Sequence, residues 1–286
     1  MDLCNINTIN KILARHGFSF SKSLGQNFII DSSVCPKMAE LAELDKNTGV
    51  IEIGAGVGVL TKELCERAGK VACVELDERL LPILDETLCD CKNLEIINAD
   101  IMKTDLSQLI AEHLGEYKTI KVCANLPYYI TSPIIMYLLE NDADIDEIVV
   151  MVQKEAAERI CAGAGTKQTG ALSIAVDYRA EAEILFNVSK ECFTPSPKVN
   201  SAVIKLTLRK EKMNIQNEKT FFRVVKSAFS QRRKTAVNSI SSQMAISKGD
   251  LAKIFEEENI SATIRPEAMT MEEFEKVANR IEKLNG

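Results

Sequence analysis

The chain has 286 residues, of which 46% are hydrophobic and 27% charged, and its formal net charge is −6. This length suits one large domain and a small one, and the composition is that of an ordinary globular protein. No run approaches the ~20 hydrophobic residues of a membrane helix, and the polar N-terminus has no signal-peptide core, so we expect a cytoplasmic protein without a membrane segment.

The predicted elements alternate between strand and helix through the first half of the chain. A short amphipathic helix over 5–16, an irregular arm over 17–31 and a helix ending near 44 come first. Hydrophobic strands follow at 50–53, 71–75, 94–98, 119–124 and 147–153, and helices fit between them at 59–68, 78–88, 106–113 and 133–140. This alternation is typical of an α/β fold with a doubly wound, Rossmann-like parallel sheet.

The second half of the chain is less regular and ends in helices. After helices near 154–162 and 171–178 and a strand at 182–186, a loop at 192–199 is stiffened by Pro195 and Pro197. A last strand is expected at 201–208, and the sequence is helical from about 220 onward. We therefore predict a domain over 1–209, which includes the arm, and a small all-helical C-terminal domain over 210–286.

A glycine-rich turn joins the first strand of the sheet to its helix. Gly54 permits a tight turn and Gly56 lets the backbone approach a ligand, while the following helix N-terminus favours polar or anionic groups. The dinucleotide fingerprint would place its third glycine at position 59, but this chain has Val59 and a glycine at 58 instead. The departure disfavours NAD and favours S-adenosylmethionine.

Acidic residues end the next two strands. Glu75 closes the second strand, where a carboxylate can bind both ribose hydroxyls, and Asp100 closes the third, where it can accept the exocyclic amine of an adenine. Either carboxylate alone is as consistent with a solvated strand end. Together with the glycines and Asn125 at successive strand ends, they predict a cofactor site.

The tetrapeptide Asn125-Leu-Pro-Tyr128 follows the fourth strand. It places an amide and an aromatic ring at the C-terminal end of a buried strand, where open α/β sheets bind ligands. Ser132 and Pro133 suit the N-cap and first turn of the next helix. This arrangement suits a flat substrate with a polar edge.

Cysteine and histidine usage argues against disulfides and metals. The nine cysteines are odd in number, never spaced Cys-x-x-Cys, and several lie in strand-like hydrophobic runs, so we interpret them as reduced packing residues. With only His16 and His113, no histidine-based metal site is expected.

Taken together, these motifs closely resemble the ribosomal RNA adenine dimethyltransferases over essentially the whole chain. The matching stretches are 23–31, 52–56, 75–77, 98–100, 125–128, 153–155, 193–199 and 229–234. The resemblance implies a Rossmann-like S-adenosylmethionine-dependent enzyme that converts two adjacent adenosines near the 3′ end of small-subunit (16S) rRNA to N6,N6-dimethyladenosine. Its partner would be 16S rRNA or a precursor of the small subunit, linked to small-subunit maturation, and we expect a monomer.

The resemblance also assigns roles to individual residues. Asn27 and the backbone of Ile29, on the arm, should contact the cofactor. Gly54, together with Gly56, should bind its methionine part, Glu75 its ribose and Asp100 its adenine. Asn125 should touch both cofactor and target. Tyr129 stands where some members of the family have Asn, and Ile29 where others have Leu.

The expected chemistry concerns a poor nucleophile, because the N6 lone pair of adenine is delocalised into the ring. Oxygen acceptors from the Asn125 side chain and the Leu126 carbonyl can hold the N6 hydrogens, and Pro127 fixes the turn that aims them. Tyr128 offers a stacking face, and Phe193 is the candidate for the opposite face, although its ring is equally consistent with a core position. The target base must leave its stack, which favours a loop or hairpin end.

Basic residues concentrate late in the chain despite the negative net charge. The segment from Lys198 to Lys234 contains eleven lysines and arginines but only two acidic residues. Such a run is often only a solvated surface, but we predict that it follows the phosphates of RNA. The candidate RNA-binding residues are Lys198, Lys205, Arg223, Lys226, Arg232, Arg233 and Lys234.

Three alternative functions remain open at this point. One is a large-subunit rRNA adenine methyltransferase of the macrolide-resistance type, which the 193–199 loop and the long helical tail disfavour. Another is a non-catalytic RNA-binding assembly factor, against which the intact tetrapeptide, Glu75 and Asp100 argue. The last is a small-molecule N-methyltransferase, which the basic stretch disfavours.

Overall fold

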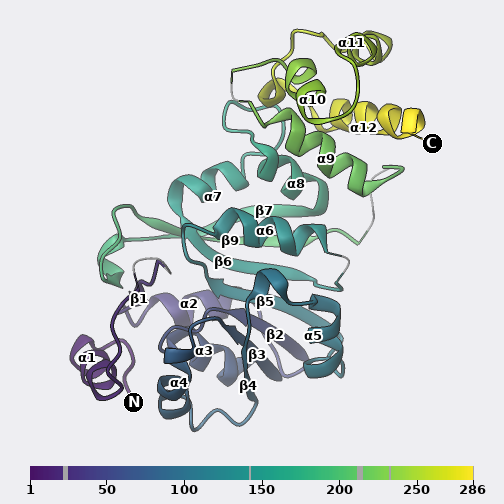
Figure 1. Cartoon of the computed structure of the whole chain (residues 1–286). Helices are drawn as coiled ribbons and strands as arrows, with labels where there is room; N and C mark the ends of the chain where they lie inside the picture. Colours follow the sequence, from purple (N-terminus) through teal and green to yellow (C-terminus); the bar gives the residue numbers. More distant parts are fainter. Residues whose placement is uncertain (22–24, 142, 211–214, 232, 286) are drawn as a thin grey trace. The chain divides into compact units, whose positions relative to one another are not determined.

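The computed structural model describes residues 1–21, 25–141, 143–210, 215–231 and 233–285. The chain forms two compact units, of which the first comprises Met1–Ala157 and Glu183–Leu208. The second comprises Glu158–Ala182 and Arg209–Gly286, so it includes a middle segment as well as the C-terminal helices. Figure 1 labels the elements of both units along the chain.

The first unit is built on a seven-stranded sheet with strand order β4-β3-β2-β5-β6-β9-β7. Neighbouring strands from β4 through β6 run parallel, whereas β9 is antiparallel to β6, so the sheet is mixed rather than fully parallel. The strands are β2 (Thr48–Ile53), β3 (Lys70–Glu75), β4 (Leu94–Asn98), β5 (Thr119–Asn125), β6 (Glu147–Gln153), β7 (Ala180–Val188) and β9 (Ser201–Leu208). The predicted α/β Rossmann-like class is confirmed, with β9 as the antiparallel addition.

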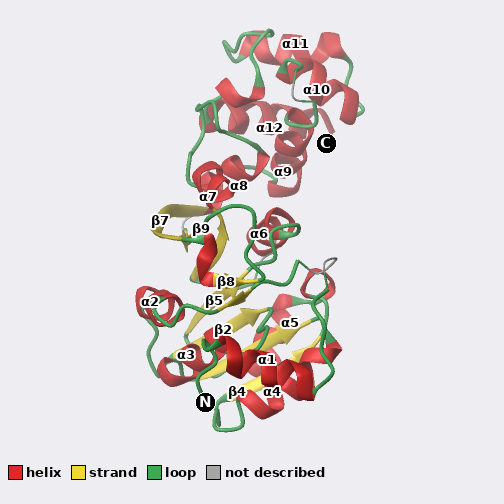
Figure 2. Ribbon diagram, turned by 90° about the vertical axis from the view of Figure 1, so that its left-hand side faces the viewer, coloured by secondary structure: helices red, strands yellow, loops and turns green. Residues whose placement is uncertain are grey.

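Helices cover both faces of this sheet, as Figure 2 shows, with α2 and α3 on one side and α5 and α6 on the other. The helices of this unit are α1 (Ile6–Arg15), α2 (Val34–Leu41), α3 (Val59–Arg67), α4 (Leu81–Thr87), α5 (Leu106–His113) and α6 (Thr131–Glu140), and α7 (Lys154–Ile160) begins in it. Short 3₁₀ turns lie at η1 (Glu78–Leu80), η2 (Ile101–Lys103) and η3 (Lys190–Cys192). Because helices cover both faces, the central strands are near-continuous hydrophobic runs, and β2 is buried along its whole length.

Charged side chains form ion pairs near the N-terminal ends of β5 and β6, where Lys121, Glu147 and Lys205 are poorly exposed. Lys121 on β5 lies 2.6 Å from the Glu147 carboxylate on β6, and Lys205 on β9 lies 3.6 Å from Glu147 and 3.2 Å from Glu43. Lys205 is therefore buried in ion pairs, and the prediction that it contacts RNA is wrong. Strand β9 is buried at every residue from Ser201 to Leu206, so this side chain is enclosed by its neighbours, which its charge alone did not reveal.

A two-stranded sheet ties the N-terminal arm to the body of the first unit. Strand β1 (Phe28–Ile29) pairs antiparallel with β8 (Phe193–Thr194), so that Ile29 lies opposite Phe193. The next residue, Ile30, donates its N–H to the Cys192 carbonyl at 2.8 Å. The pairing joins the arm to the proline-stiffened loop across more than 160 residues of sequence.

The second unit is helical and begins within α7. Its further elements are α8 (Ala171–Arg179), α9 (Glu218–Ala228), α10 (Ala236–Gln243), α11 (Lys248–Glu257), η4 (Pro266–Ala268) and α12 (Met271–Asn285). The rings of Tyr178, Phe221 and Phe222 cluster between α8 and α9, with centroids 4.7 to 5.6 Å apart. Asn217, Thr235 and Ser247 cap α9, α10 and α11 by accepting backbone N–H groups. None of the helices in the described parts of the chain is long and hydrophobic enough to span a bilayer.

Candidate active site

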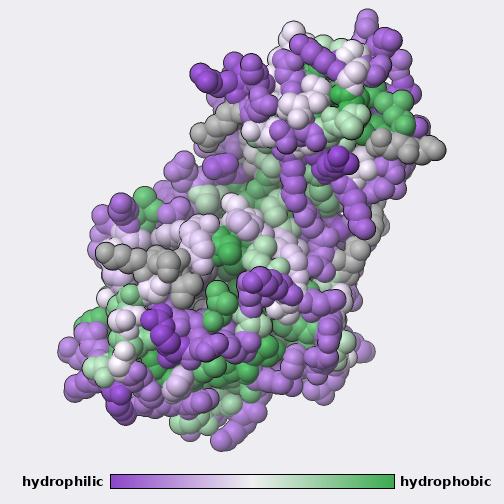
Figure 3. Space-filling model, in the orientation of Figure 1, coloured by the Kyte–Doolittle hydropathy of each residue, from purple (hydrophilic) through white to green (hydrophobic). Residues whose placement is uncertain are grey.

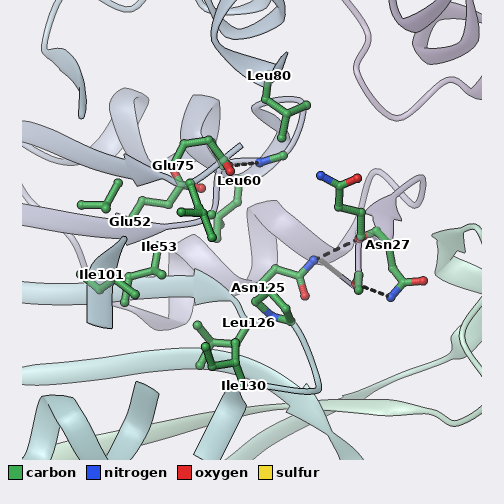
Figure 4. A pocket seen from close by; sticks show the side chains of 18 of the residues that line it. Asn27, Glu52, Ile53, Leu60, Glu75, Leu80, Ile101, Asn125, Leu126 and Ile130 are labelled. Carbon is green, nitrogen blue, oxygen red and sulfur yellow. Dashed lines mark hydrogen bonds between the residues drawn. The ribbon is translucent and has the colours of Figure 1, made fainter. Parts of the chain in front are cut away.

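A cavity opens at the C-terminal ends of β2, β3 and β5, within the first unit. Its wall is built from the glycine turn, two strand-end carboxylates, the Asn125 turn and the arm. Figure 4 labels Glu75, Asn125 and Asn27 among its lining residues. Figure 3 shows hydrophobic side chains gathered among hydrophilic ones on the visible face of this unit. The predicted residues that line the cavity are Asn27, Ile29, Gly54, Gly56, Glu75, Asp100, Asn125, Leu126, Pro127 and Tyr128.

The glycine turn has the backbone conformation that its sequence requires. Gly54, Gly56 and Gly58 all have positive φ, at 76°, 59° and 90°, a region that other residues rarely adopt. Gly58 is the residue before α3, and a Cβ built there would lie 2.9 Å from the Leu88 side chain. Position 58 therefore needs glycine for both reasons, whereas Val59 already belongs to the helix.

Glu75 lies at the end of β3 with only 6% of its surface exposed. One carboxylate oxygen accepts the Asp77 N–H at 2.9 Å and the other accepts the Gly56 N–H at 3.4 Å. Burial raises the pKa of Glu75, and these two N–H groups partly counteract it. Since a carboxylate has about four acceptor positions, two remain for a pair of neighbouring hydroxyl groups such as those of a ribose.

Asp100 follows β4 and caps the short turn η2. One of its oxygens accepts the Met102 N–H at 3.0 Å, and the other lies 3.4 Å from the Lys103 ammonium. The hydrophobic side chains of Leu76 and Ile101 line the cavity next to the two carboxylates. A flat base with an exocyclic amine would meet hydrophobic surface on its faces and an acceptor at its edge.

The Asn125 turn is held by backbone hydrogen bonds and by the Thr131 hydroxyl. Leu126 donates its N–H to the Met151 carbonyl at 3.2 Å, and the Pro127 carbonyl accepts from Ile130 N–H and the Thr131 hydroxyl at 3.1 Å each. Helix α6 begins at Thr131, and the residue before it makes no side-chain capping hydrogen bond. The prediction of a start at Pro133 with Ser132 as N-cap is therefore wrong, because both residues already lie in the first turn of the helix.

Tyr128 and Asn125 are both oriented by residues distant in sequence. The Tyr128 hydroxyl lies 2.6 Å from the Ser201 hydroxyl on β9, and burial raises the pKa of Tyr128. The Asn125 amide nitrogen donates to the Asn27 carbonyl at 3.4 Å, as Figure 4 shows. The arm and the Asn125 turn are therefore in direct contact across the cavity.

The arm is further fixed to the turn after β3 by contacts that sequence reasoning missed. The Gln26 amide donates to the Asp77 carboxylate at 2.7 Å, and Arg79 binds the same carboxylate at 2.6 and 2.8 Å. Phe28 covers the glycine turn, with its ring 3.2 Å from the Cβ that a side chain at Gly56 would add. The two matched stretches that contain Gln26 and Asp77 were the available signal, but their pairing depends on how the arm folds back.

Phe193 is not at the cavity wall. Its ring is 3% exposed and belongs to the hydrophobic cluster that contains Ile29, Val34 and Met38. It lies there because β8 pairs with β1. A base could stack on Phe193 only after these neighbours had moved, so its stacking role stays a prediction.

The candidate RNA-binding residues are divided between the two units. Lys198 is exposed on the loop before β9 in the first unit, and Arg223 and Lys226 are exposed on α9 in the second. Arg233 and Lys234 are exposed just before α10, whereas Arg232 lies outside the described residues. Their role in RNA binding remains untested.

The sheet, the glycine turn and the carboxylates at the ends of β3 and β4 define the class of S-adenosylmethionine-dependent methyltransferases. The sequence profile of the ribosomal RNA adenine dimethylase family matches residues 17–283. The chain therefore belongs to the ribosomal RNA adenine dimethylase family, and the predictions of an rRNA adenine dimethyltransferase with S-adenosylmethionine as cofactor are confirmed.

Individual relatives match almost over their full length. Ribosomal RNA small subunit methyltransferase A of Streptococcus sanguinis strain SK36 is 44% identical over 285 residues, covering 98% of both chains. The protein of the same name from Lachnoclostridium phytofermentans is 47% identical over 277 residues, covering 96% of this chain and 95% of its own.

Solved structures agree in fold. A dimethyladenosine transferase from Plasmodium falciparum has a TM-score of 0.72 at 24% identity, covering 90% of this chain and 98% of its own. The 23S rRNA methyltransferase ErmE has a TM-score of 0.64 at 24% identity, covering 89% of this chain and 99% of its own. At this identity the two structures support the fold alone.

Proposed function

We propose that the protein dimethylates N6 of two adjacent adenosines near the 3′ end of 16S rRNA within a precursor of the small ribosomal subunit. The observation that carries this proposal is the 44% identity, over 98% of both chains, to a small-subunit methyltransferase. We further propose that it acts as a monomer in the cytoplasm, where such a precursor would be found.

The cavity supports a division of labour among its residues. Gly54 and Gly56 leave room for the methionine part, Glu75 accepts from the ribose hydroxyls, and Asp100 accepts from the adenine amine. Asn27 and the Ile29 backbone close the cavity from the arm. When bound, S-adenosylmethionine supplies an electrophilic methyl group.

The Asn125 turn prepares the target nitrogen. The Asn125 side-chain oxygen and the Leu126 carbonyl accept the two N6 hydrogens, which turns the lone pair away from conjugation and toward the cofactor side. Tyr128, held by Ser201, supplies a stacking face worth about 1–3 kcal/mol. No strong base is required, because the nitrogen loses its proton after it has been methylated, and orientation supplies most of the rate.

The substrate assignment is tested by transfer of a tritiated methyl group to two substrates. We expect labelling of small-subunit particles from cells lacking the protein, with two adjacent modified adenosines mapped by primer extension. Labelling only of protein-free large-subunit RNA would instead support the macrolide-resistance type of enzyme.

The acceptor site is tested with Asn125→Ala. We expect methyl transfer to fall at least about 100-fold, as when a group that acts only on the transition state is removed, while RNA binding stays nearly unchanged. Asn187→Ala, on the exposed part of β7, is the matched control and should retain full activity. Unchanged methylation by the Asn125 variant would refute the assignment.

A further inference from the structure

Tyr129 carries an exposed aromatic ring at the cavity, and the proposed mechanism gives it no role. The residue lines the cavity, yet 56% of its surface is exposed. Among the described residues, Leu76 is the other exposed large hydrophobic side chain in the cavity wall, and it follows Glu75 in the part proposed for the cofactor. The exposed surface of Tyr129 is therefore left to a further flat group, for which an aromatic ring is suited.

The arm supports this ring from one side. A Cβ built at Gly25 would lie 3.2 Å from the Tyr129 ring and 3.8 Å from the Pro127 side chain, so the ring lies directly against the glycine. The Asn27 side-chain amide donates to the Gly25 carbonyl at 3.0 Å, which fixes the glycine in turn. The ring is thus braced by the arm while the rest of its surface stays open to solvent.

The two tyrosines of the turn contact different elements. The Tyr128 hydroxyl lies 2.6 Å from the Ser201 hydroxyl on β9, whereas the Tyr129 ring lies against Gly25 on the arm. The turn between them is closed by the Ile130 N–H, which donates to the Pro127 carbonyl at 3.1 Å. Because the two rings are directed to separate elements, a base that stacks on Tyr128 leaves Tyr129 uncovered.

The proposed substrate supplies a second base at this place. A nucleotide that leaves its stack to enter the cavity exposes the bases next to it, and those bases stay at the cavity mouth. Proteins that bind single-stranded RNA commonly stack successive bases on aromatic side chains. Since the two target adenosines are adjacent, each is the neighbour of the other when it is not in the cavity.

We propose that Tyr129 stacks on the base of the nucleotide adjacent to the target adenosine, and so forms a second base site at the cavity mouth. The inference rests on the proposed function of the same cavity. Stacking uses the face of a base rather than its N6 edge, so the site holds a neighbouring adenosine before and after that adenosine has been dimethylated. Because stacking tolerates any base, the same ring serves when either adenosine is the target.

Steady-state kinetics with small-subunit particles test the proposal through Tyr129→Ala and Tyr129→Phe. We expect Tyr129→Ala to raise the KM for the particles at least about fivefold, the loss of one stacked base, with kcat changed by less than about twofold. Tyr129→Phe keeps the ring and should stay within about twofold of the unmodified protein. An unchanged KM in Tyr129→Ala would overturn the proposal.

Cofactor affinity separates stacking on RNA from a role in closing the arm. Calorimetry with S-adenosylmethionine should give the same Kd for Tyr129→Ala and the unmodified protein, and a weakened Kd that accounts for the whole kinetic loss would overturn the proposal. Ile184→Ala is the matched control, because Ile184 is 40% exposed on β7 of the same unit but does not line the cavity. This variant should keep the KM of the unmodified protein.

Fluorescence detects the stacked base directly, because the chain contains no tryptophan. Tyr129→Trp introduces a single indole, and a hairpin RNA whose loop carries two adjacent adenosines should quench its emission on binding. A hairpin with one loop adenosine flanked by abasic nucleotides should bind without quenching. The same indole at Ile184→Trp should respond to neither RNA. Equal quenching of the Tyr129 variant by both hairpins would contradict contact with the neighbouring base.

Failure of this inference is distinguishable from failure of the proposed function. Methylation of small-subunit particles by the unmodified protein, with unaltered kinetics in Tyr129→Ala, would leave the enzyme assignment standing and refute the second base site. Absence of methylation by the unmodified protein would instead refute the proposed function, and with it the site that rests on it.

Discussion

At the scale of single residues, the site depends on side chains held by distant partners, and the Tyr128 hydroxyl is the clearest case. Its contact with Ser201 fixes a ring that would otherwise rotate in the cavity mouth. We expect Tyr128→Phe and Ser201→Ala each to lower kcat/KM on small-subunit particles about 5- to 10-fold, the worth of one hydrogen bond. Because both variants remove the same contact, the double variant should be no worse than either. If the fold losses of the two single variants multiplied in the double variant, Ser201 would not act by positioning Tyr128.

The sequence predicted some site residues and missed others for a physical reason. Glu75, Asp100 and Asn125 were predictable because parallel strands bring their C-terminal ends to one edge. Gln26 was missed, because its contact with the Asp77 carboxylate depends on how the arm folds back over the end of β3. Burial of Phe193 depends on β1 pairing with β8, which no local pattern encodes.

At the scale of elements, the arm is held on the turn after β3 by the hydrogen bond from Gln26 to the Asp77 carboxylate. Hydrogen bonds from Arg79 and Gln26 hold the pKa of Asp77 below its ordinary value despite partial burial, so the bound carboxylate stabilises the closed arm. We expect Asp77→Asn to speed exchange of the arm amides about 10-fold or more, as at Ile30, whose N–H donates to the Cys192 carbonyl. Asp45→Asn is the control, because hydrogen bonds from Thr48 and Asn47 also lower the pKa of the Asp45 carboxyl, in a turn before β2. This variant should leave the exchange rates of the arm amides unchanged.

The same contacts give the arm a defined pH dependence. Since the pKa of Asp77 is lower in the folded state, its contribution is complete above the unfolded value of about 4 and is lost as the pH falls through the folded value. Protection of the arm amides should therefore decrease below about pH 4 in the unmodified protein. Protection in Asp77→Asn should show a smaller decrease over the same range, and equal decreases would show that Asp77 is not responsible.

Element types were predictable from the sequence, but their ends were less so. The strand at 201–208 and the helix at 106–113 match the prediction, because their hydrophobic pattern and flanking residues agree. The helix predicted to end near 44 stops at Leu41, and Glu43 adopts a positive φ. There the Ala42 carbonyl accepts from the buried Lys121 ammonium at 2.9 Å, a tertiary contact outside any local signal.

At the scale of the whole molecule, a net charge of −6 coexists with a substrate that is a polyanion. Net charge also counts bases that are already paired with carboxylates in the first unit, as Lys121 and Lys205 are with Glu147. Net charge is therefore a poor guide to partners here, and the distribution of exposed bases matters more. Arg233 and Lys234 are exposed at adjacent positions in the second unit.

These two residues allow the RNA-binding prediction to be measured through salt. If both contact phosphates, Arg233→Gln with Lys234→Gln should reduce the slope of log affinity against log salt by roughly 1–2, because fewer counterions are released. At saturating RNA the methylation rate should stay the same, since neither residue lines the cavity. Lys248→Gln with Lys253→Gln, exposed bases on α11 of the same unit, makes the same charge change and should keep the slope. Equal slopes for the two double variants would contradict specific phosphate contacts of Arg233 and Lys234.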